Sequence, residues 1–343
     1  MKKIIINGRF LLHRVTGVER YAREILSELD KILLPGEYEL AVPPEVDDIP
    51  HYKNIKITKM GKLHNRLWEH ISFPLYVIKN RAISLNLCNV APLIAPGIVC
   101  IMDTKIKSHP EFYSKKFLFW YRILFFNAIK RSKLIITISE FSKNEICKYY
   151  HIDRDNIVVV PCAWQHFERV GYADDALKKY DLEEAKYYFS MCSLEPNKNF
   201  AWIAETARRE PDSTFAIAGS INKKVFADGL GFECPDNMKL LGYVSDEEAK
   251  TLMRYCKGFL FPSIYEGFGI PPLEAMSAGC PNVIVSDTPV MHEVFDNSVS
   301  YIDLDSYTMP AIRDNMHESN DQLAKYSWEI SAIKMKKELA RIG

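Results

Sequence analysis

Phe261-Pro262-Ser263-Ile264-Tyr265-Glu266-Gly267-Phe268-Gly269-Ile270-Pro271-Pro272-Leu273-Glu274 is the stretch that carries the clearest structural signal in the chain. The apolar run 258–261 predicts a β-strand that ends at Phe261-Pro262. Two glycines then mark a turn, and Pro271 suits the first turn of a helix that closes near Gly279. Strand, glycine turn and helix together form one unit of an α/β fold.

The same alternation of strand and helix runs through the rest of the chain. Apolar or β-branched runs predict strands at 4–6, 55–58, 98–101, 134–138, 157–160, 187–191, 214–218 and 282–285. Periodic spacing or capping residues predict helices over 19–33, from Ser139 to about 150, from about 199, from Ser245 to about 255, and over 321–342. Two successive sets of such units predict two domains with doubly wound parallel sheets, joined by a connector at 161–185.

Composition excludes several classes of protein. The chain has 343 residues, with 44 basic and 44 acidic side chains, so no overall field favours nucleic acid. No apolar run reaches the ~18 residues of a membrane span, and the apolar start is too short for a signal peptide. The 8 cysteines include no Cys-x-x-Cys pair and no zinc spacing. We therefore expect a cytoplasmic protein, soluble or peripheral, with buried reduced thiols.

The glycine turn also predicts a site for a ligand. Backbone N–H groups at 267–270 would lie at a helix N-terminus, where a diphosphate binds readily. Glu274, expected in the first helical turn, could accept hydrogen bonds from the cis-diol of a ribose. Glu266, on the loop, could face a sugar hydroxyl or a developing positive charge. The alternative is a tight Gly/Pro turn with two acids that merely stabilise the helix.

Two Asp-x-Asp patterns have the spacing that some transferases use to hold a divalent ion. They are Asp153-Arg154-Asp155 and Asp303-Leu304-Asp305, and turn-forming neighbours predict a surface turn at each. We therefore expect neither a metal ion nor another cofactor.

Motifs in order along nearly the whole chain resemble a large family of retaining glycosyltransferases, family 4 or group 1, which includes sucrose synthases and many O-antigen and capsule mannosyltransferases. The Glu266-to-Glu274 spacing matches the family's pattern of two glutamates separated by seven residues. The other matching stretches are Gly8-Arg9-Phe10, Thr16-Gly17-Val18-Glu19-Arg20-Tyr21, Arg66-Leu67-Trp68-Glu69, Asp103 with His109-Pro110-Glu111-Phe112, Ser139-Glu140-Phe141-Ser142, Ser193-Leu194-Glu195-Pro196-Asn197-Lys198-Asn199, Leu241-Gly242-Tyr243-Val244-Ser245 and Tyr326-Ser327-Trp328-Glu329. Polysaccharide mannosyltransferases look like the nearest subgroup.

The resemblance implies a GT-B fold, in which two Rossmann-like domains face each other across a cleft. The expected parts are an acceptor domain over 1–165, a donor domain over 166–322 and a C-terminal helix over 323–343 that crosses back to the first domain. The implied activity is transfer of a hexose, mannose-like, from a GDP- or UDP-linked donor to a glycan or polyprenyl-linked acceptor in the synthesis of surface polysaccharide or O-antigen.

The resemblance also implies roles for single residues. Lys198, Glu266 and Asp103 are the expected catalytic residues, and Lys198 would neutralise phosphate charge as the sugar leaves. The expected donor-binding residues are Gly17, Ser193, Lys198, Tyr243, Val244, Glu266, Gly267, Phe268, Gly269, Ile270 and Glu274. Many family members have a histidine where this chain has Met102, and an arginine where it has Ser193. Arg20 and His109 are candidates for the missing polar contacts on the acceptor side.

The acceptor side has a second sequence feature. Residues 63–79 and 115–133 interleave aromatic and apolar side chains with Lys and Arg. Such segments could rest on the inner membrane, or they could be buried helices with a basic edge.

Two other functions are compatible with the same fold. A nucleotide-sugar isomerase or hydrolase would convert the donor without an acceptor. A catalytically weak nucleotide-sugar-binding homologue would bind a nucleotide without turnover, which Met102 and Ser193 make plausible. A nicotinamide dehydrogenase is disfavoured, since no Gly-x-Gly-x-x-Gly follows the strand at 4–6.

Overall fold

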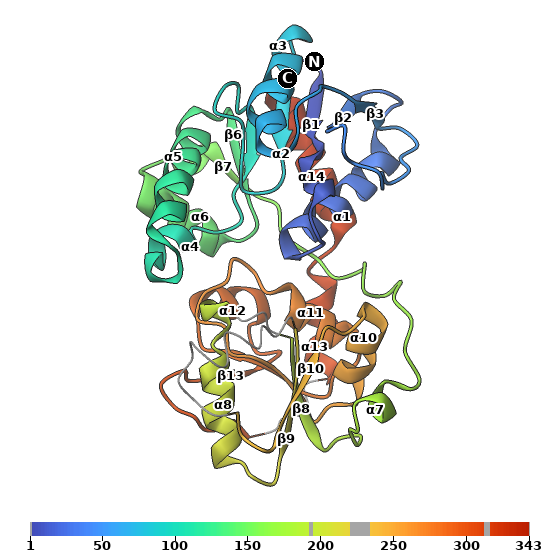
Figure 1. The fold of residues 1–343 in the computed structure, drawn as a ribbon, viewed down its shortest axis with the longest axis vertical. Coiled ribbons are helices and arrows are strands. Elements are labelled where there is room, and N and C mark those ends of the chain that lie inside the picture. Colours follow the sequence, from blue (N-terminus) through green and yellow to red (C-terminus); the bar gives the residue numbers. More distant parts are fainter. Residues whose placement is uncertain (1, 192–194, 220–233, 312–315, 343) are drawn as a thin grey trace. The chain divides into compact units, whose positions relative to one another are not determined.

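The computed structural model describes residues 2–191, 195–219, 234–311 and 316–342. The chain divides into two compact units (Figure 1). The first comprises Met1–Cys162 together with Ser327–Gly343, and the second comprises Ala163–Tyr326. Each unit is built around one parallel β-sheet covered by helices.

The first unit has a seven-stranded sheet in the order β3-β2-β1-β4-β5-β6-β7, and every neighbouring pair is parallel. Four of its strands, β1, β5, β6 and β7, consist mainly of Val, Ile and Leu rather than of alternating polar and apolar residues, as is typical of a parallel sheet covered on both faces. The strands are β1 (Ile4–Asn7), β2 (Tyr38–Val42), β3 (Lys56–Lys59), β4 (Ile83–Asn86), β5 (Ile98–Cys100), β6 (Leu134–Thr137) and β7 (Ile157–Val159).

The helical elements of this unit are α1 (Gly17–Ile32), α2 (Asn65–Leu67), α3 (Phe73–Lys79), α4 (Lys105–Ser108), α5 (Lys115–Arg131), α6 (Glu140–Tyr150), α14 (Trp328–Ile342), η1 (Gly8–Leu12), η2 (Trp68–Ser72), η3 (Pro110–Phe112) and η4 (Arg154–Asn156). The register of the sheet assigns two of them to one face. Ile5, Val99 and Ile135 point to the same side, because strand pairing connects them through the β4 residues Ser84 and Asn86.

Side chains from two helical segments pack on that side of the sheet. Trp68, Phe73 and Val77 of the segment α2–η2–α3 form a cluster with Ile5. Phe125, Ala128 and Ile129 of α5 form a cluster with Val99 and Ile135. The segment α2–η2–α3 and helix α5 therefore belong to one helical layer over the same face of the sheet.

Helix α14 belongs to the first unit, although it ends the chain. Its Trp328 ring meets Tyr21 of α1 edge-on, with the ring centroids 5.9 Å apart. The Ser331 hydroxyl donates to the Pro161 carbonyl at 2.8 Å. The continuous helix predicted over 321–342 is wrong, because the chain forms α13 (Met316–Ala324) and then α14 with a break at 325–327.

The second unit repeats the architecture with a six-stranded parallel sheet in the order β10-β9-β8-β11-β12-β13. The strands are β8 (Tyr187–Met191), β9 (Thr214–Ala218), β10 (Met238–Gly242), β11 (Gly258–Phe261), β12 (Val283–Ser286) and β13 (Ser300–Ile302). Its helical elements are α7 (Ala176–Lys179), η5 (Pro196–Lys198), α8 (Phe200–Arg209), α10 (Asp246–Tyr255), α11 (Ile270–Ser277), α12 (Pro289–Phe295) and α13.

All the predicted strands are confirmed to within one residue at each end, as are the caps at Ser139 and Ser245. Strands β2, β4, β10 and β13 were not predicted from the sequence. In the first three, charged or polar residues interrupt the apolar run, as Glu39 does in β2. Glu39 is nevertheless buried, because the Tyr76 hydroxyl donates to its carboxylate at 2.6 Å.

The chain passes from the first unit to the second after Cys162 and returns to the first after Tyr326. Both positions are a few residues from the expected domain boundaries at 165/166 and 322/323. Two side chains explain the difference. The Trp164 indole donates to the Leu323 carbonyl at 2.9 Å, and the Gln165 amide donates to the Tyr326 carbonyl at 2.8 Å. These bonds hold both ends of the connection within the second unit.

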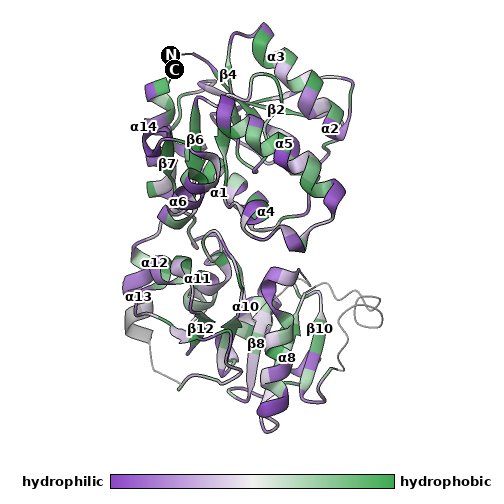
Figure 2. Ribbon diagram, turned by 90° about the vertical axis from the view of Figure 1, so that its left-hand side faces the viewer, coloured by the Kyte–Doolittle hydropathy of each residue, from purple (hydrophilic) through white to green (hydrophobic). Residues whose placement is uncertain are grey.

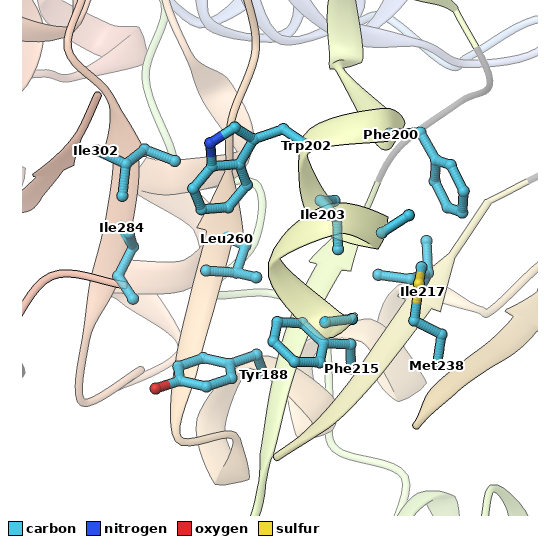
Figure 3. Packing of buried hydrophobic residues seen from close by; sticks show 12 residues of the cluster. Tyr188, Phe200, Trp202, Ile203, Phe215, Ile217, Met238, Leu260, Ile284 and Ile302 are labelled. Carbon is cyan, nitrogen blue, oxygen red and sulfur yellow. The ribbon is translucent and has the colours of Figure 1, made fainter. Parts of the chain in front are cut away.

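The core of the second unit is centred on Trp202 of α8 (Figure 3). The Trp202 ring is buried among apolar side chains that include Leu260 of β11 and Ile302 of β13. Its indole N–H donates to the Ser306 carbonyl at 2.9 Å, so the polar atom is also satisfied. Within the described residues, no helix is both long and apolar enough to cross a bilayer.

Truncation of this residue tests the packing. Trp202→Ala should lower the free energy of unfolding by about 3–5 kcal/mol, because it leaves a large cavity. Trp120→Ala is the matched control, since Trp120 is 53% exposed on α5, and its effect should stay within about 0.5 kcal/mol. Urea unfolding followed by circular dichroism measures both, and equal losses would contradict this view of the core.

Candidate functional site

The best-formed candidate site lies in the second unit, where two loops leave neighbouring strands. From β8 the chain crosses over to β9, its neighbour toward one edge of the sheet. From β11 it crosses over to β12, its neighbour toward the other edge. The helices that follow therefore diverge, and the carboxyl ends of β8 and β11 share an edge of the sheet. In open parallel sheets, ligands bind at such a point of reversal.

Lys198 and Glu266 meet at this edge. The Lys198 ammonium donates to Glu266 Oε1 at 2.6 Å, and their side chains are 20% and 18% exposed. The same ammonium lies 5.2 Å from the centre of the Phe261 ring, the last residue of β11. The structure thus brings together two of the expected catalytic residues, which are 68 positions apart in the chain.

The neighbouring backbone holds these two loops together. The Ile264 N–H donates to the Asn197 carbonyl at 2.7 Å, and the Asn197 amide donates to the Tyr265 carbonyl at 3.3 Å. Asn197 is itself buried. These hydrogen bonds connect the loop that carries Lys198 to the loop that carries Glu266, so the two side chains are held on one connected structure.

The N-terminus of α11 adjoins this pair. Gly269 caps the helix with φ of +114°, and a Cβ there would come within about 3.1 Å of the Phe295 ring, so only glycine fits. Within the described residues, the N–H groups of Phe268, Gly269 and Ile270 have no acceptor. Three adjacent donors at the positive end of a helix suit an anionic ligand.

An aromatic contact fixes the loop before α11. Phe268 is buried, and Tyr326 meets its ring edge-on with the centroids 5.1 Å apart. Burial and the negative charge of Glu293 raise the pKa of Tyr326 to about 12, so its phenol is neutral near pH 7.

Glu274 lies deeper in the helix than the sequence indicated. Helix α11 begins at Ile270, so Glu274 falls in the second turn, and the expectation of a first-turn position is wrong. Pro271 and Pro272 lie in the first turn of α11, where their lack of an N–H group leaves no donor unsatisfied. Glu274 is 5% exposed, so its carboxylate is buried in this part of the unit.

A histidine that the sequence analysis missed holds Glu274. His166, which is 3% exposed, lies 2.7 Å through Nε2 from Glu274 Oε1. In the described residues, no hydrogen bond reaches the second oxygen, Oε2. One carboxylate oxygen is thus fixed while the other can receive a ligand. A separation of 108 residues and the absence of a motif around His166 hid this pair.

Tyr243 and Val244 follow the edge strand β10, which is separated from β8 by β9. Tyr243 is 67% exposed, whereas Val244 is buried. The Gly219 N–H donates to the Gly242 carbonyl at 2.7 Å and ties the ends of β9 and β10 together. Tyr243 therefore stands at the carboxyl edge of the sheet, two strands from the Lys198–Glu266 pair.

Gly17 and Arg20 belong to the first unit and open helix α1. Thr16 and Glu19 form a capping box at this end of the helix. Burial favours a higher pKa for Glu19, but hydrogen bonds with His13 and Thr16 outweigh it and hold the pKa below its usual value. Gly17 is exposed and Arg20 is half-buried.

Asp103 and His109 flank α4 in the same unit. Asp103 is half-buried and accepts a hydrogen bond from the Lys105 N–H at 2.9 Å. His109 lies 2.9 Å from Glu111 and stacks on Phe112. Met102, at the position of the family's histidine, is buried in the core with 4% exposure.

The first unit contains a polar cluster that the sequence analysis also missed. Asn7 at the end of β1 donates to Glu69 at 3.0 Å and to Asn86 of β4 at 3.1 Å. Arg9 pairs with the other Glu69 oxygen at 3.1 Å. The order of this sheet reverses between β1 and β4, so the cluster occupies the equivalent position to the Lys198–Glu266 pair. Burial lowers the pKa of the adjacent His70.

The remaining expectations concern metals, cysteines and Ser193. In both Asp-x-Asp patterns the first aspartate accepts from the N–H two residues on, so the predicted turns are confirmed. No group of three or more His, Cys, Asp or Glu in the described residues could hold a metal. The described cysteines are free, and burial raises the pKa of the Cys100 and Cys162 thiols. Ser193 lies outside the described residues.

The His166–Glu274 pair can be tested by a double-mutant cycle. His166→Ala and Glu274→Ala each leave a buried polar partner behind, so the double variant should cost less than the sum, with a coupling of about 1–2 kcal/mol. The exposed pair His292–Asp287, at 2.6 Å, is the matched control and should couple by less than about 0.5 kcal/mol. Urea unfolding measures both cycles, and additive costs at His166 and Glu274 would refute the assignment.

The chain is similar in sequence to known glycosyltransferases. Residues 174–316 match the family of glycosyl transferases group 1. The chain is 28% identical to the O-antigen chain mannosyltransferase RfbU of Salmonella typhimurium, over 95% of this chain and 96% of that one. It is 26% identical to the O-antigen chain mannosyltransferase B of Escherichia coli, over 85% and 84% of the two chains.

Solved structures share the fold at low identity. A sucrose-phosphate synthase from Thermosynechococcus elongatus superposes with a TM-score of 0.74 at 13% identity, over 100% of this chain and 99% of that one. Anabaena HepE, in complex with UDP and glucose, superposes with a TM-score of 0.69 at 13% identity, over 99% and 100%. The chain therefore has the GT-B fold, and residues 174–316 of its second unit match the glycosyl transferases group 1.

Proposed function

We propose that the protein is a retaining glycosyltransferase that moves a mannose-like hexose from a GDP- or UDP-linked donor to a glycan or polyprenyl-linked acceptor. The product would be part of a surface polysaccharide. The relatives named as O-antigen mannosyltransferases support the sugar and the pathway. The UDP in the HepE structure supports a nucleotide-linked donor.

The single observation that carries the proposal is the Lys198–Glu266 pair beside the uncapped N-terminus of α11. A diphosphate at this edge would accept hydrogen bonds from the N–H groups of 268–270. Lys198 would exchange part of its contact with Glu266 for a phosphate oxygen. Glu266 would then be placed to accept a hydrogen bond from the donor sugar.

Glu274 and Tyr243 would hold the nucleoside. The free Oε2 of Glu274 would accept hydrogen bonds from the ribose diol, with Oε1 held by His166. Tyr243, exposed at the end of β10, would meet the base through its backbone together with Val244. Gly17 would approach the diphosphate, and Ser193 would donate a hydrogen bond to it.

We propose same-face substitution at the anomeric carbon. The bond from C1 to the diphosphate oxygen breaks with its electron pair, and the acceptor oxygen bonds to C1 on the same face. The acceptor's proton passes to the departing phosphate oxygen. The protein would position the reactants and stabilise charge, with Lys198 and the α11 N–H groups opposing the charge that grows on phosphate. The step as written uses no metal ion.

The acceptor contacts are assigned to the first unit. Asp103 would orient the attacking hydroxyl, with Arg20 and His109 beside it as further polar groups. We place the enzyme in the cytoplasm, and its free buried thiols support a reducing compartment.

A panel of nucleotides tests the donor. We expect one of UDP, GDP, ADP, CDP and TDP to stabilise the protein by about 2.7 kcal/mol at 100 times its dissociation constant, which raises Tm by several degrees for a chain of this size. Glu274→Ala and Lys198→Ala should lose the shift. Lys178→Ala, an exposed lysine of α7, should keep it. A flat panel with wild-type protein would sink the proposal.

Transfer assays with the donor so identified test the catalytic role. Lys198→Met should lower kcat by about 10²–10³-fold, since it removes a charge that matters most as phosphate leaves. Donor turnover that needs no acceptor would instead indicate the isomerase or hydrolase function. Nucleotide binding without any turnover would indicate a binding protein.

A further inference from the structure

One face of the first unit exposes large apolar side chains that a water-facing surface rarely shows. Most of the exposed large apolar residues in the described chain come from three segments of this unit. They are Leu67, Ile71, Leu75 and Ile78 of the segment α2–η2–α3, Leu93 and Ile94 of a loop, and Phe119, Trp120, Ile123 and Phe126 of α5.

The helices concerned are apolar on two sides. In α5, Phe125, Ala128 and Ile129 fill the core, while Phe119 and Phe126 are 62% and 57% exposed. Figure 2 shows green apolar stretches alternating with purple polar ones along α2, α3 and α5. A helix that only covered a core would carry polar residues on its outer side.

The segment α2–η2–α3 presents a single outward stripe. Leu67, Ile71, Leu75 and Ile78 are spaced by three or four residues, which is one face of a helix. The turn at η2 is a π-helix, closed by the Phe73 N–H to the Trp68 carbonyl, and Pro74 has no N–H to give.

The three segments belong to the same helical layer. The sheet register places α2–η2–α3 and α5 over one face. The Asn127 amide and the Arg131 guanidinium of α5 donate to the Leu93 carbonyl at 3.1 and 3.2 Å, so the loop is tied to α5. Leu93 and the outer side chains of α5 line an open hollow of about 820 Å³.

The charges on this layer have one sign. The exposed cations are Lys62, Arg66, Lys79, Arg81, Lys115, Lys116, Arg122, Lys130, Arg131 and Lys133. Residues 115–133 contain no Asp or Glu, and the only acid in 61–99 is Glu69, which is buried against Arg9. Within the described part of the chain, no carboxylate forms an ion pair with these cations. The full chain has zero formal net charge, so the asymmetry is local.

We propose that this apolar–basic face, made of the exposed side chains of 62–81, 93–94 and 115–133, docks on an anionic lipid bilayer. Phe119, Trp120 and Phe126 would enter the interface between headgroups and acyl chains. The cations would extend to lipid phosphates. A second copy of the chain would instead bring like charges together, which disfavours self-association through this face.

The proposal goes beyond sugar transfer and is independent of it. Docking would hold the enzyme where a polyprenyl-linked acceptor resides. Vesicle binding needs neither donor nor acceptor, so its failure would leave the nucleotide results untouched.

Vesicle flotation of the full chain tests the proposal. Wild type should float with vesicles of phosphatidylcholine and phosphatidylglycerol, far less with phosphatidylcholine alone, and less as salt screens the charges. The apolar variant Phe119→Ser/Trp120→Ser/Phe126→Ser and the charge variant Lys115→Glu/Arg122→Glu/Lys130→Glu should each bind at least ~10-fold more weakly.

Matched controls lie on α14 of the same unit. Ile330→Ser/Ile333→Ser and Lys334→Glu/Lys337→Glu change exposed residues of the same kinds and should bind as wild type does. An unchanged Tm and nucleotide shift would show that every variant is folded. The proposal fails if wild type does not float, if the two face variants float as wild type does, or if the apolar variant only dissolves a dimer seen by analytical ultracentrifugation.

Discussion

Parallel strands cannot be joined by tight hairpins, and this constraint governs both units. Each strand must return through a crossover that covers one face of the sheet. In each unit the order of strands reverses once, between β1 and β4 and between β8 and β11. At that point the covering helices diverge, and the carboxyl ends of two strands stay accessible. Lys198 and Glu266 occupy this edge in the second unit, so the candidate site follows from the winding of the chain.

Both reversal points contain a cation paired with a glutamate. Arg9 meets Glu69 at 3.1 Å in the first unit, and Lys198 meets Glu266 at 2.6 Å in the second. Partly buried ions need such partners, because removal from water is costly. The pairs differ in their surroundings. Glu69 also receives a bond from Asn7 and is deeply buried, whereas Glu266 remains partly accessible beside the unpaired N–H groups of α11. Only the second arrangement therefore suits an exchange of partner with an anionic ligand.

The covering helices of the two units differ in the side chains that they expose. Helix α8 of the second unit turns one apolar side to the core through Trp202 and Ile203 and exposes charged residues on the other. Helix α5 of the first unit is apolar on both sides and basic at its edges. An overall charge of zero conceals this difference. The proposed donor site thus lies at the sheet edge of one unit, and the proposed lipid-binding surface lies on the helical layer of the other.

The sequence alone determined the type and position of most strands, because buried parallel strands are continuous apolar runs, and it located the turn at 266–270, because glycine and proline restrict the backbone there. The same turn placed Glu266 among the candidates, whereas Lys198 became a candidate only through resemblance to a family. Strands with polar residues, such as β2, were not predicted. The hydrogen-bond partner that allows Glu39 to be buried, Tyr76, lies 37 residues further along the chain. Only the tertiary structure joined His166 to Glu274 and assigned α2–η2–α3 and α5 to one face. These relations depend on sheet register and crossover, which bring together residues that no local pattern connects.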